Sequence, residues 1–156
     1  MRSSAFRTAA TDLSRDPDFF AVLTGSYRRR LGAALVPEGT DAVWLYEQAP
    51  FVVLAHDGGA DPRFVYANRA AQACFGYGRD ELVGLPSRLS AEAPERAERQ
   101  RLLDAVVRDG FTRGYRGLRI AKGGRRFWIE QAVVWQLDRD GVSVGQAATF
   151  SAWRDA

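Results

Sequence analysis

The chain has 156 residues and a net charge of +3, which suits a single globular domain. Its one cysteine and one histidine exclude an internal disulfide and a Cys/His zinc cluster. No apolar run is long enough to span a membrane and the N-terminus lacks the apolar core of a secretory signal, so we expect a cytoplasmic protein without a membrane partner.

The N-terminal third is predicted to be helical after a short tail. Residues 1–15 are polar and without pattern, which predicts a flexible tail. In the helical segment 16–49, Asp16 and Pro17 have the order of an N-cap and a first helical residue. An apolar stripe with helical spacing follows: Phe20, Leu23, Tyr27, Leu31 and Ala34. A second short helix should end before Pro50.

Residues 50–152 are predicted to form the main domain, which begins with two strands. The apolar runs at 51–56 and 63–67 predict these strands. Asn68 stands where the N-cap of a short helix would lie, and Gly76 should end that helix.

A longer helix is predicted at residues 94–108, with a buried stripe of Leu102, Leu103, Val106 and Val107. Glu95 and Arg99 have the i,i+4 spacing that is typical of an exposed helix face. Because most arginines lie beside acids and no reading helix accompanies the bare cluster at 28–30, the sequence does not favour nucleic-acid binding.

Three strands are predicted at the end of the chain, at residues 111–121, 125–137 and 144–153. Gly123 and Gly124 lie between the first two, and the sequence DRDG lies between the last two, both typical of hairpins. The order of helices and strands therefore predicts an α+β domain with an antiparallel sheet.

The segments FVYANRAAQACFGYGRDELVG and GLRIAKGGRRFWIEQAVVW together resemble a PAS domain. More narrowly, SYRRRLG, WLYEQAPFVVLAH, LPSRLSAE and GQAATF resemble the MEKHLA family. This PAS-like group occurs as free-standing bacterial proteins and at the C-terminus of plant homeodomain–leucine zipper regulators. The resemblance implies a five-stranded antiparallel sheet, helices over one face after an N-terminal helical lead, and a pocket for a small ligand. It also implies that the other face of the sheet meets partner proteins.

A flavin photoreceptor is the most specific functional hypothesis that the resemblance offers, because the LOV branch of PAS domains carries a reactive cysteine. In GLPSRLS, Ser87 stands where that cysteine would be, and a hydroxyl cannot form the flavin adduct. Arg119 and Ile129 stand where the LOV pattern has asparagines, while Arg88 matches a phosphate-binding arginine. A LOV photoreceptor is not favoured; a non-covalent flavin or another planar ligand remains an alternative.

Cys74 shares a helical face with Ala70 and Ala71, and we expect it to face the sheet. A thiol in apolar surroundings has a raised pKa and is inert. We therefore favour a structural role for Cys74 over a redox sensor.

The facing of the long hairpin decides which side chains can line a pocket. Strict alternation along residues 125–137 places Phe127, Ile129, Gln131, Val133 and Trp135 on the inner face. A two-residue Gly-Gly turn would turn Arg119 outward against Trp128, whereas a three-residue turn would turn it inward. We choose the outward arrangement, because an inward guanidinium without an anionic partner would be costly.

The outer face is the candidate interface, with Phe20, Tyr27, Arg119, Trp128 and Val134 as its residues. Two arrangements remain open at this point. The N-terminal helices could cover this face, or the face could form a homodimer or bind a signalling protein.

The resemblance and the facing argument together define the candidate pocket residues: Phe51, Val53, Tyr66, Asn68, Cys74, Arg88, Ile129, Gln131, Val133, Trp135 and Gln146. Among these, Asn68 is favoured as a helix cap and Tyr66 as part of the core, and His56 outside the set is expected to be a surface or capping histidine. The sequence contains no credible catalytic constellation, and it identifies neither a metal site nor a cofactor. We expect a sensory module that holds a small apolar or planar molecule, with a ligand-free dimerisation module as the alternative.

Overall fold

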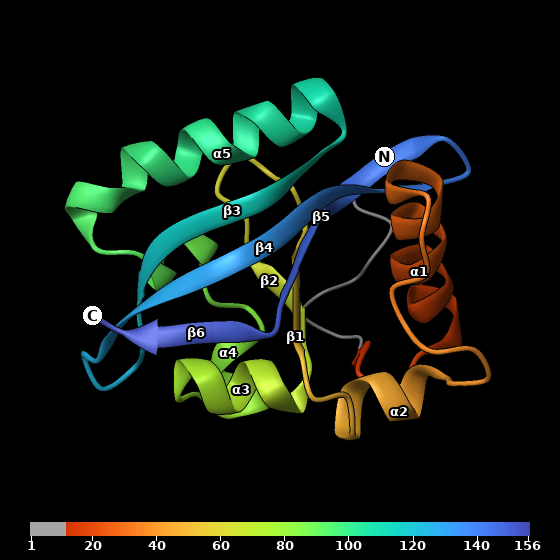
Figure 1. Cartoon of the computed structure of the whole chain (residues 1–156), viewed down its shortest axis with the longest axis horizontal. Coiled ribbons are helices and arrows are strands. Elements are labelled where there is room, and N and C mark those ends of the chain that lie inside the picture. Colours follow the sequence, from red (N-terminus) through yellow and green to blue (C-terminus); the bar gives the residue numbers. More distant parts are fainter. Residues whose placement is uncertain (1–11) are drawn as a thin grey trace.

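The structure is a computed structural model that describes residues 12–156. Within this range the helices are α1 (Pro17–Leu31), α2 (Ala42–Glu47), α3 (Arg69–Phe75), α4 (Arg79–Leu82) and α5 (Arg96–Asp109), with short 3-10 turns at Ser87–Ser90 and Ala93–Glu95. The strands are β1 (Val52–His56), β2 (Phe64–Ala67), β3 (Phe111–Ile120), β4 (Arg126–Arg139), β5 (Val142–Phe150) and β6 (Ala152–Asp155). Figure 1 shows α5 running along β3, and α1 lying beside the hairpin that joins β4 to β5.

The described strands form one antiparallel sheet in the order β2-β1-β5-β4-β3, and β6 also pairs with β4. The predicted α+β fold is therefore confirmed, with one strand more than expected in this part of the chain. The extra strand arises because the last predicted strand bends at Ser151. Before the bend Thr149 pairs with Val133, and after it Ala152 pairs with Glu130.

Helix α1 has a capping residue at each end, an aspartate before its first turn and a glycine after its last. The side chain of Asp16 accepts a hydrogen bond from the Phe19 amide at 3.2 Å, which satisfies one free N–H of the first turn. Gly32 ends the helix in the left-handed conformation, with φ 72°. Arg29 and Arg30 in the last turn form ion pairs with Asp138 of β4 at 2.5 and 2.7 Å. These contacts fix the helix against the sheet.

Helices α1 and α2 cover one face of the sheet, which we call the outer face. The outer cluster of buried residues joins both helices to β1, β2, β4 and β5, and it includes Phe19, Leu23, Leu45, Val53, Tyr66, Trp135 and Leu137. Of the two arrangements that the sequence left open, the structure therefore has the one in which the N-terminal helices cover the sheet.

The predicted tail reaches into this cluster. Residues 1–11 of that tail lie outside the described residues. Leu13 is only 3% exposed and belongs to the outer cluster, so the prediction of a loose tail is wrong for this part of it. The division of the chain at residue 50 stays a prediction.

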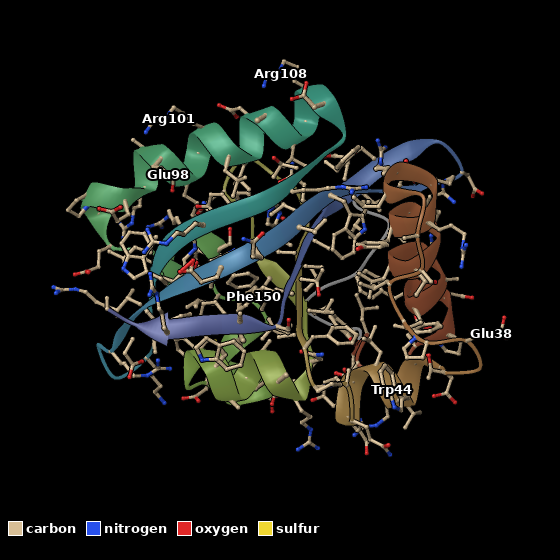
Figure 2. All side chains as sticks on the ribbon, viewed as in Figure 1. Glu38, Trp44, Glu98, Arg101, Arg108 and Phe150 are labelled. Carbon is tan, nitrogen blue, oxygen red and sulfur yellow. The ribbon has the colours of Figure 1, made fainter. Side chains whose placement is uncertain are left out.

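Helices α3, α4 and α5 lie over the opposite, inner face. The inner cluster includes Leu54, Phe64, Cys74, Phe75, Phe127, Ile129 and Phe150. In Figure 2, Arg101 and Arg108 project from α5 into solvent, away from the sheet, so the opposite side of this helix faces the sheet. Leu103 and Val106 are buried there as predicted, whereas Val107 is 67% exposed and the predicted stripe is wrong at this residue.

Strand β4 changes sides at Gln131, which corrects the facing predicted from strict alternation. Gln131 has φ 53°, and three residues of β4 span the distance that two residues of β3 span opposite. Phe127 and Ile129 before this bulge belong to the inner cluster, but Val133 and Trp135 after it belong to the outer one. The bulge itself leaves Gln131 exposed, not inward as expected.

The turn between β3 and β4 has three residues rather than two. The Ala121 amide donates to the Arg125 carbonyl at 2.8 Å, and Ile120 pairs with Arg126. Gly124 takes the left-handed conformation, φ 92°, that this turn requires. The register therefore slips by one residue and turns Arg119 inward, so the predicted outward facing is wrong.

Candidate functional site

A cavity of about 60 Å³ lies between the inner face of the sheet and α5. Most of its wall is apolar, and the main contributors are Leu54, Phe64, Phe75, Leu103, Ile129 and Phe150. Its volume is several times the space that one buried water needs. Figure 2 shows the ring of Phe150 in the interior of the molecule. The cavity is therefore an apolar chamber into which a few polar side chains reach.

Arg119 is the first of these polar side chains. It is 7% exposed, since the slipped hairpin register directs it from β3 into the cavity wall. One nitrogen, Nη1, donates to the Leu118 carbonyl at 2.9 Å, and Nη2 donates to the Tyr115 hydroxyl at 3.1 Å. Both partners are neutral.

Arg99 is the second, and it enters the cavity wall from α5. It lies one turn before Leu103 on the stripe that faces the sheet, and it is 6% exposed. The expectation of a solvated Arg99 is therefore wrong. Its guanidinium donates to the Ser87 hydroxyl. Burial, and next the charge of Arg119, lower the pKa of Arg99 to about 10, so the side chain still carries its charge at neutral pH.

Tyr115 connects this arginine pair to the protein surface. Its hydroxyl accepts from Arg119 and donates to Glu98 Oε1 at 2.8 Å. Burial is the main cause that raises the pKa of Tyr115, so the hydroxyl stays protonated and able to donate. The carboxylate of Glu98 thus meets the tyrosine and not a guanidinium.

His56 and Gln146 form a second polar group in the cavity wall. They are register partners on β1 and β5, and both are buried. His56 Nδ1 accepts from the Gly58 amide at 3.2 Å, and Gln146 Nε2 donates to the Leu103 carbonyl at 3.1 Å. No hydrogen bond of good geometry reaches His56 Nε2 or Gln146 Oε1 among the described residues, although the Gln146 side chain lies close enough to His56 to oppose the lowering of its pKa. Such atoms are costly to bury alone and typically meet a water or a ligand.

The environment of His56 keeps its imidazole neutral. Burial lowers its pKa to about 4, with a further contribution from the charge of Arg99. The expectation that His56 lies at the surface is therefore wrong, whereas its alternative as a capping residue agrees with the hydrogen bond from the Gly58 amide. A second hollow of about 160 Å³ lies on the other side of this group and shares His56, Leu103 and Gln146 with the cavity. These three side chains separate the apolar chamber from a more polar hollow.

Few of the predicted pocket residues line the cavity. Ile129 and Gln146 do, as do Arg119 and Val134 from the set expected at the interface. The remaining apolar candidates belong to the outer cluster or pack against it: Phe51, Val53, Tyr66, Val133 and Trp135. The reason is geometric, because alternate residues of β1 face opposite sides and the bulge reverses the end of β4.

The remaining polar candidates have other roles in the structure. Asn68 caps α3 through the Ala71 amide at 3.0 Å, accepts from Val53, and donates to the Leu45 and Phe51 carbonyls. Arg88 is exposed and forms an ion pair with Asp61 at 3.1 Å. Neither side chain belongs to the cavity wall.

Cys74 is buried within the inner cluster and does not line the cavity. Burial raises the pKa of this thiol to about 12, although the charge of Arg125 opposes the shift. Its environment is therefore that of an inert core thiol.

Two of the predicted interface residues follow one of the arrangements that the sequence left open, and Trp128 differs in its contact. Phe20 and Tyr27 pack against the outer cluster, so they cover the sheet of their own chain. Trp128 meets the guanidinium of Arg116, 3.8 Å above its ring, and not Arg119 as predicted. The slipped register is again the cause.

Sequence reasoning missed Arg99, Tyr115 and His56 as parts of this site. A signal existed for Arg99, because it lies four and seven residues before Leu103 and Val106 on one helical face. The two others offered none, since the inward facing of Tyr115 and His56 depends on strand register.

Comparison with solved structures places this fold among PAS and LOV domains. A PAS domain from Colwellia psychrerythraea is similar with a TM-score of 0.57 and 18% identity, covering 71% of this chain and 90% of that one. The LOV domain of a blue-light activated histidine kinase from Erythrobacter litoralis has a TM-score of 0.54 and 22% identity, covering 69% and 97%. A PAS domain in complex with ethanol, from a LuxR-family transcriptional regulator of Burkholderia thailandensis, has a TM-score of 0.57 and 19% identity, covering 74% and 97%.

The fold is that of a PAS domain, with a cavity on the inner face of its sheet. The family model of the MEKHLA domain matches residues 17–155, nearly the whole chain. The chain belongs to the MEKHLA domain family, which confirms the resemblance seen in the sequence. No curated protein matches it. Between residues 12 and 156, no helix has the length and apolar character needed to cross a membrane, and no group of three or more His, Cys, Asp or Glu could hold a metal ion.

Proposed function

We propose that this domain is a non-catalytic, cytoplasmic sensory module that holds a small molecule in the cavity between the sheet and α5. The observation that carries the proposal is an apolar chamber whose wall contains two buried polar side chains, His56 and Gln146. Ligand sites typically have this composition, with apolar walls and a few polar groups that orient the ligand.

The volume of the cavity favours a small ligand. About 60 Å³ is far below the roughly 300–1,000 Å³ of pockets that enclose drug-sized molecules. The related fold from Burkholderia thailandensis was solved with ethanol, a molecule of suitable size. A flavin receives less support, because Ile129 offers no hydrogen bond in the cavity wall.

A route for signalling leads through β4. Val134 lines the cavity, and the next residue, Trp135, packs against Tyr27 of α1 on the opposite face. A ligand that shifts β4 would therefore also shift α1, where a signalling protein or a second copy of the chain would sense the change. Small displacements in packed interiors are transmitted in this way because side chains there have little free space.

Native mass spectrometry of the chain purified from its own host, with an absorbance spectrum, tests the proposal. We expect a retained small mass in the wild type. Ala148 lies on the cavity wall between Leu54 and Val134, so Ala148→Leu should fill the chamber and remove that mass. Val142→Leu, at an exposed residue of β5 that borders neither hollow, is the matched control and should retain it.

A ligand-free interaction module is the second candidate function, because a cavity this small can be closed by a side chain. An unliganded dimer in the wild type, unchanged by Ala148→Leu, would support this second candidate and contradict the first.

A further inference from the structure

We infer that the molecule held in this cavity is a small organic anion, whose carboxylate lies between the guanidinium groups of Arg99 and Arg119. The inference rests on the proposed ligand-binding function and specifies the chemical class of the ligand. It concerns the two arginines that enter the cavity from opposite sides, Arg99 from α5 and Arg119 from β3.

Both arginines carry buried charge without a carboxylate partner. Each is less than one tenth exposed, and neither forms an ion pair within residues 12–156. Their hydrogen-bond partners in that range are neutral: the Ser87 hydroxyl, the Leu118 carbonyl and the Tyr115 hydroxyl. Exposed arginines of the same chain, such as Arg116 and Arg126, do meet a carboxylate. A buried charge is normally paired, because removing it from water is costly.

The two charges also repel each other. Next to burial, the charge of Arg119 is the largest cause of the lowered pKa of Arg99, so the groups lie close enough to interact. Two carboxylates in this region are hydrogen-bonded elsewhere, since Glu98 accepts from Tyr115 and Asp61 accepts from Arg88, and Asp61 acts on Arg99 only through its charge. An anion in the cavity would relieve the repulsion and supply the missing partner for both guanidinium groups.

The shape and polarity of the wall select a carboxylate with a hydrocarbon part. A planar guanidinium presents two parallel N–H groups that match the two oxygens of a carboxylate. Leu54, Phe64, Phe75 and Ile129 form an apolar wall beside the arginines, which would favour a short carbon chain or ring over a fully hydrated inorganic ion.

Isothermal titration calorimetry of the full chain, freed of any retained ligand, tests this inference with matched probes. The acids are acetate and propanoate, which suit a cavity of about 60 Å³, and the neutral controls are acetamide and propanamide, which have nearly the same shape. We expect at least one acid to bind at least tenfold more tightly than its amide. Inorganic phosphate should bind more weakly than that acid, and tighter binding of phosphate would overturn the choice of an organic anion.

The variants Arg119→Met and Arg99→Met remove one guanidinium each and keep an apolar side chain of similar length. Each should weaken binding of the acid at least tenfold and leave binding of the amide unchanged. Arg116→Met is the control on the same strand, since Arg116 is exposed and lies over Trp128. Circular dichroism checks that each variant is folded. If either fails to fold, the comparison of acid and amide in the wild type still decides.

The outcomes separate the two proposals. Equal affinity for acids and amides, or a retained neutral ligand in the native mass spectrum, would overturn the anion and leave the ligand-binding function standing. The absence of any retained mass together with no binding of any probe would overturn both.

Discussion

The ring of Tyr27 meets the ring of Trp135 edge-on, with the ring centroids 5.0 Å apart and the planes at 84°. Tyr27 belongs to α1 and Trp135 to β4, so this pair joins the N-terminal helix to the strand that also borders the cavity. Edge-to-face aromatic pairs stabilise a fold by about 0.5–1.5 kcal/mol beyond the area that they bury. The pair is therefore both an anchor for α1 and the physical link in the proposed signalling route.

Replacing Tyr27 by alanine should lower the free energy of unfolding by about 2 kcal/mol, because a half-buried ring and its aromatic partner are lost. Urea unfolding followed by far-ultraviolet circular dichroism measures this change. Tyr27→Phe keeps the ring and should stay within about 0.5 kcal/mol of the wild type. An equally small effect for the alanine variant would show that α1 is not fixed by this contact.

The acid dependence of stability should contain a component from His56. Its folded pKa of about 4 lies below the ordinary value of 6.5, so the unfolded state binds the proton more readily. The contribution of the neutral imidazole to the free energy of unfolding is therefore fully present above about pH 6.5. It is lost as the pH falls toward 4, which lowers the free energy of unfolding by up to about 3 kcal/mol. His56→Gln should remove this component from the pH profile of the urea midpoint.

Because His56 is the only histidine in the chain, its imidazole C2 proton should give a single histidine signal in the NMR spectrum of the folded protein. A midpoint near pH 4 is expected for that signal. A midpoint near 6.5 would mean that the side chain is solvated, and would remove it from the cavity wall.

Cys74 should be unreactive in the folded protein. Its raised pKa, about 12, leaves almost no thiolate at neutral pH, and its side chain is buried. Alkylation by iodoacetamide at pH 7.5, followed by mass spectrometry, should label the chain only after guanidinium unfolding. Rapid labelling of the folded chain would restore the redox-sensor hypothesis that the sequence left as a minor alternative.

Gly145 should tolerate no side chain. Its φ is 150°, and a Cβ there would collide with the backbone carbonyl oxygen of His56 on the neighbouring strand. Gly145→Ala should therefore cost about 3 kcal/mol and disturb the pairing of β1 with β5. Gly123→Ala is the control, because a Cβ at Gly123 meets nothing within 4 Å, and it should be nearly neutral in the same urea titration.

Much of the fold could be predicted from local signals, because each signal acts within a few residues. Asp16 and Asn68 cap their helices as expected and Gly76 ends α3, whereas α1 ends at Leu31 before Gly32, short of the predicted Ala34. The order of strands and helices then determined the fold class. The extra strand β6 was missed, because pairing across a bend depends on the partner strand rather than on local sequence.

The site was harder to predict, because it depends on single-residue differences in register. A three-residue turn instead of a two-residue one decides that Arg119 faces the cavity, and both lengths are compatible with the sequence around Gly123 and Gly124. The cost of burying an unpaired arginine argued for the wrong choice. The same cost now supports the anionic ligand.

The bulge at Gln131 has a consequence for comparing this chain with its relatives. Suppose that a relative lacks the additional residue and is aligned to this chain without a gap at Gln131. Each aligned pair of residues along the remainder of β4 would then face opposite sides of the sheet. An ungapped alignment would then equate Val134, which borders the chamber, with a residue under the N-terminal helix. Transfer of ligand contacts between family members is therefore sound only when this insertion is located first.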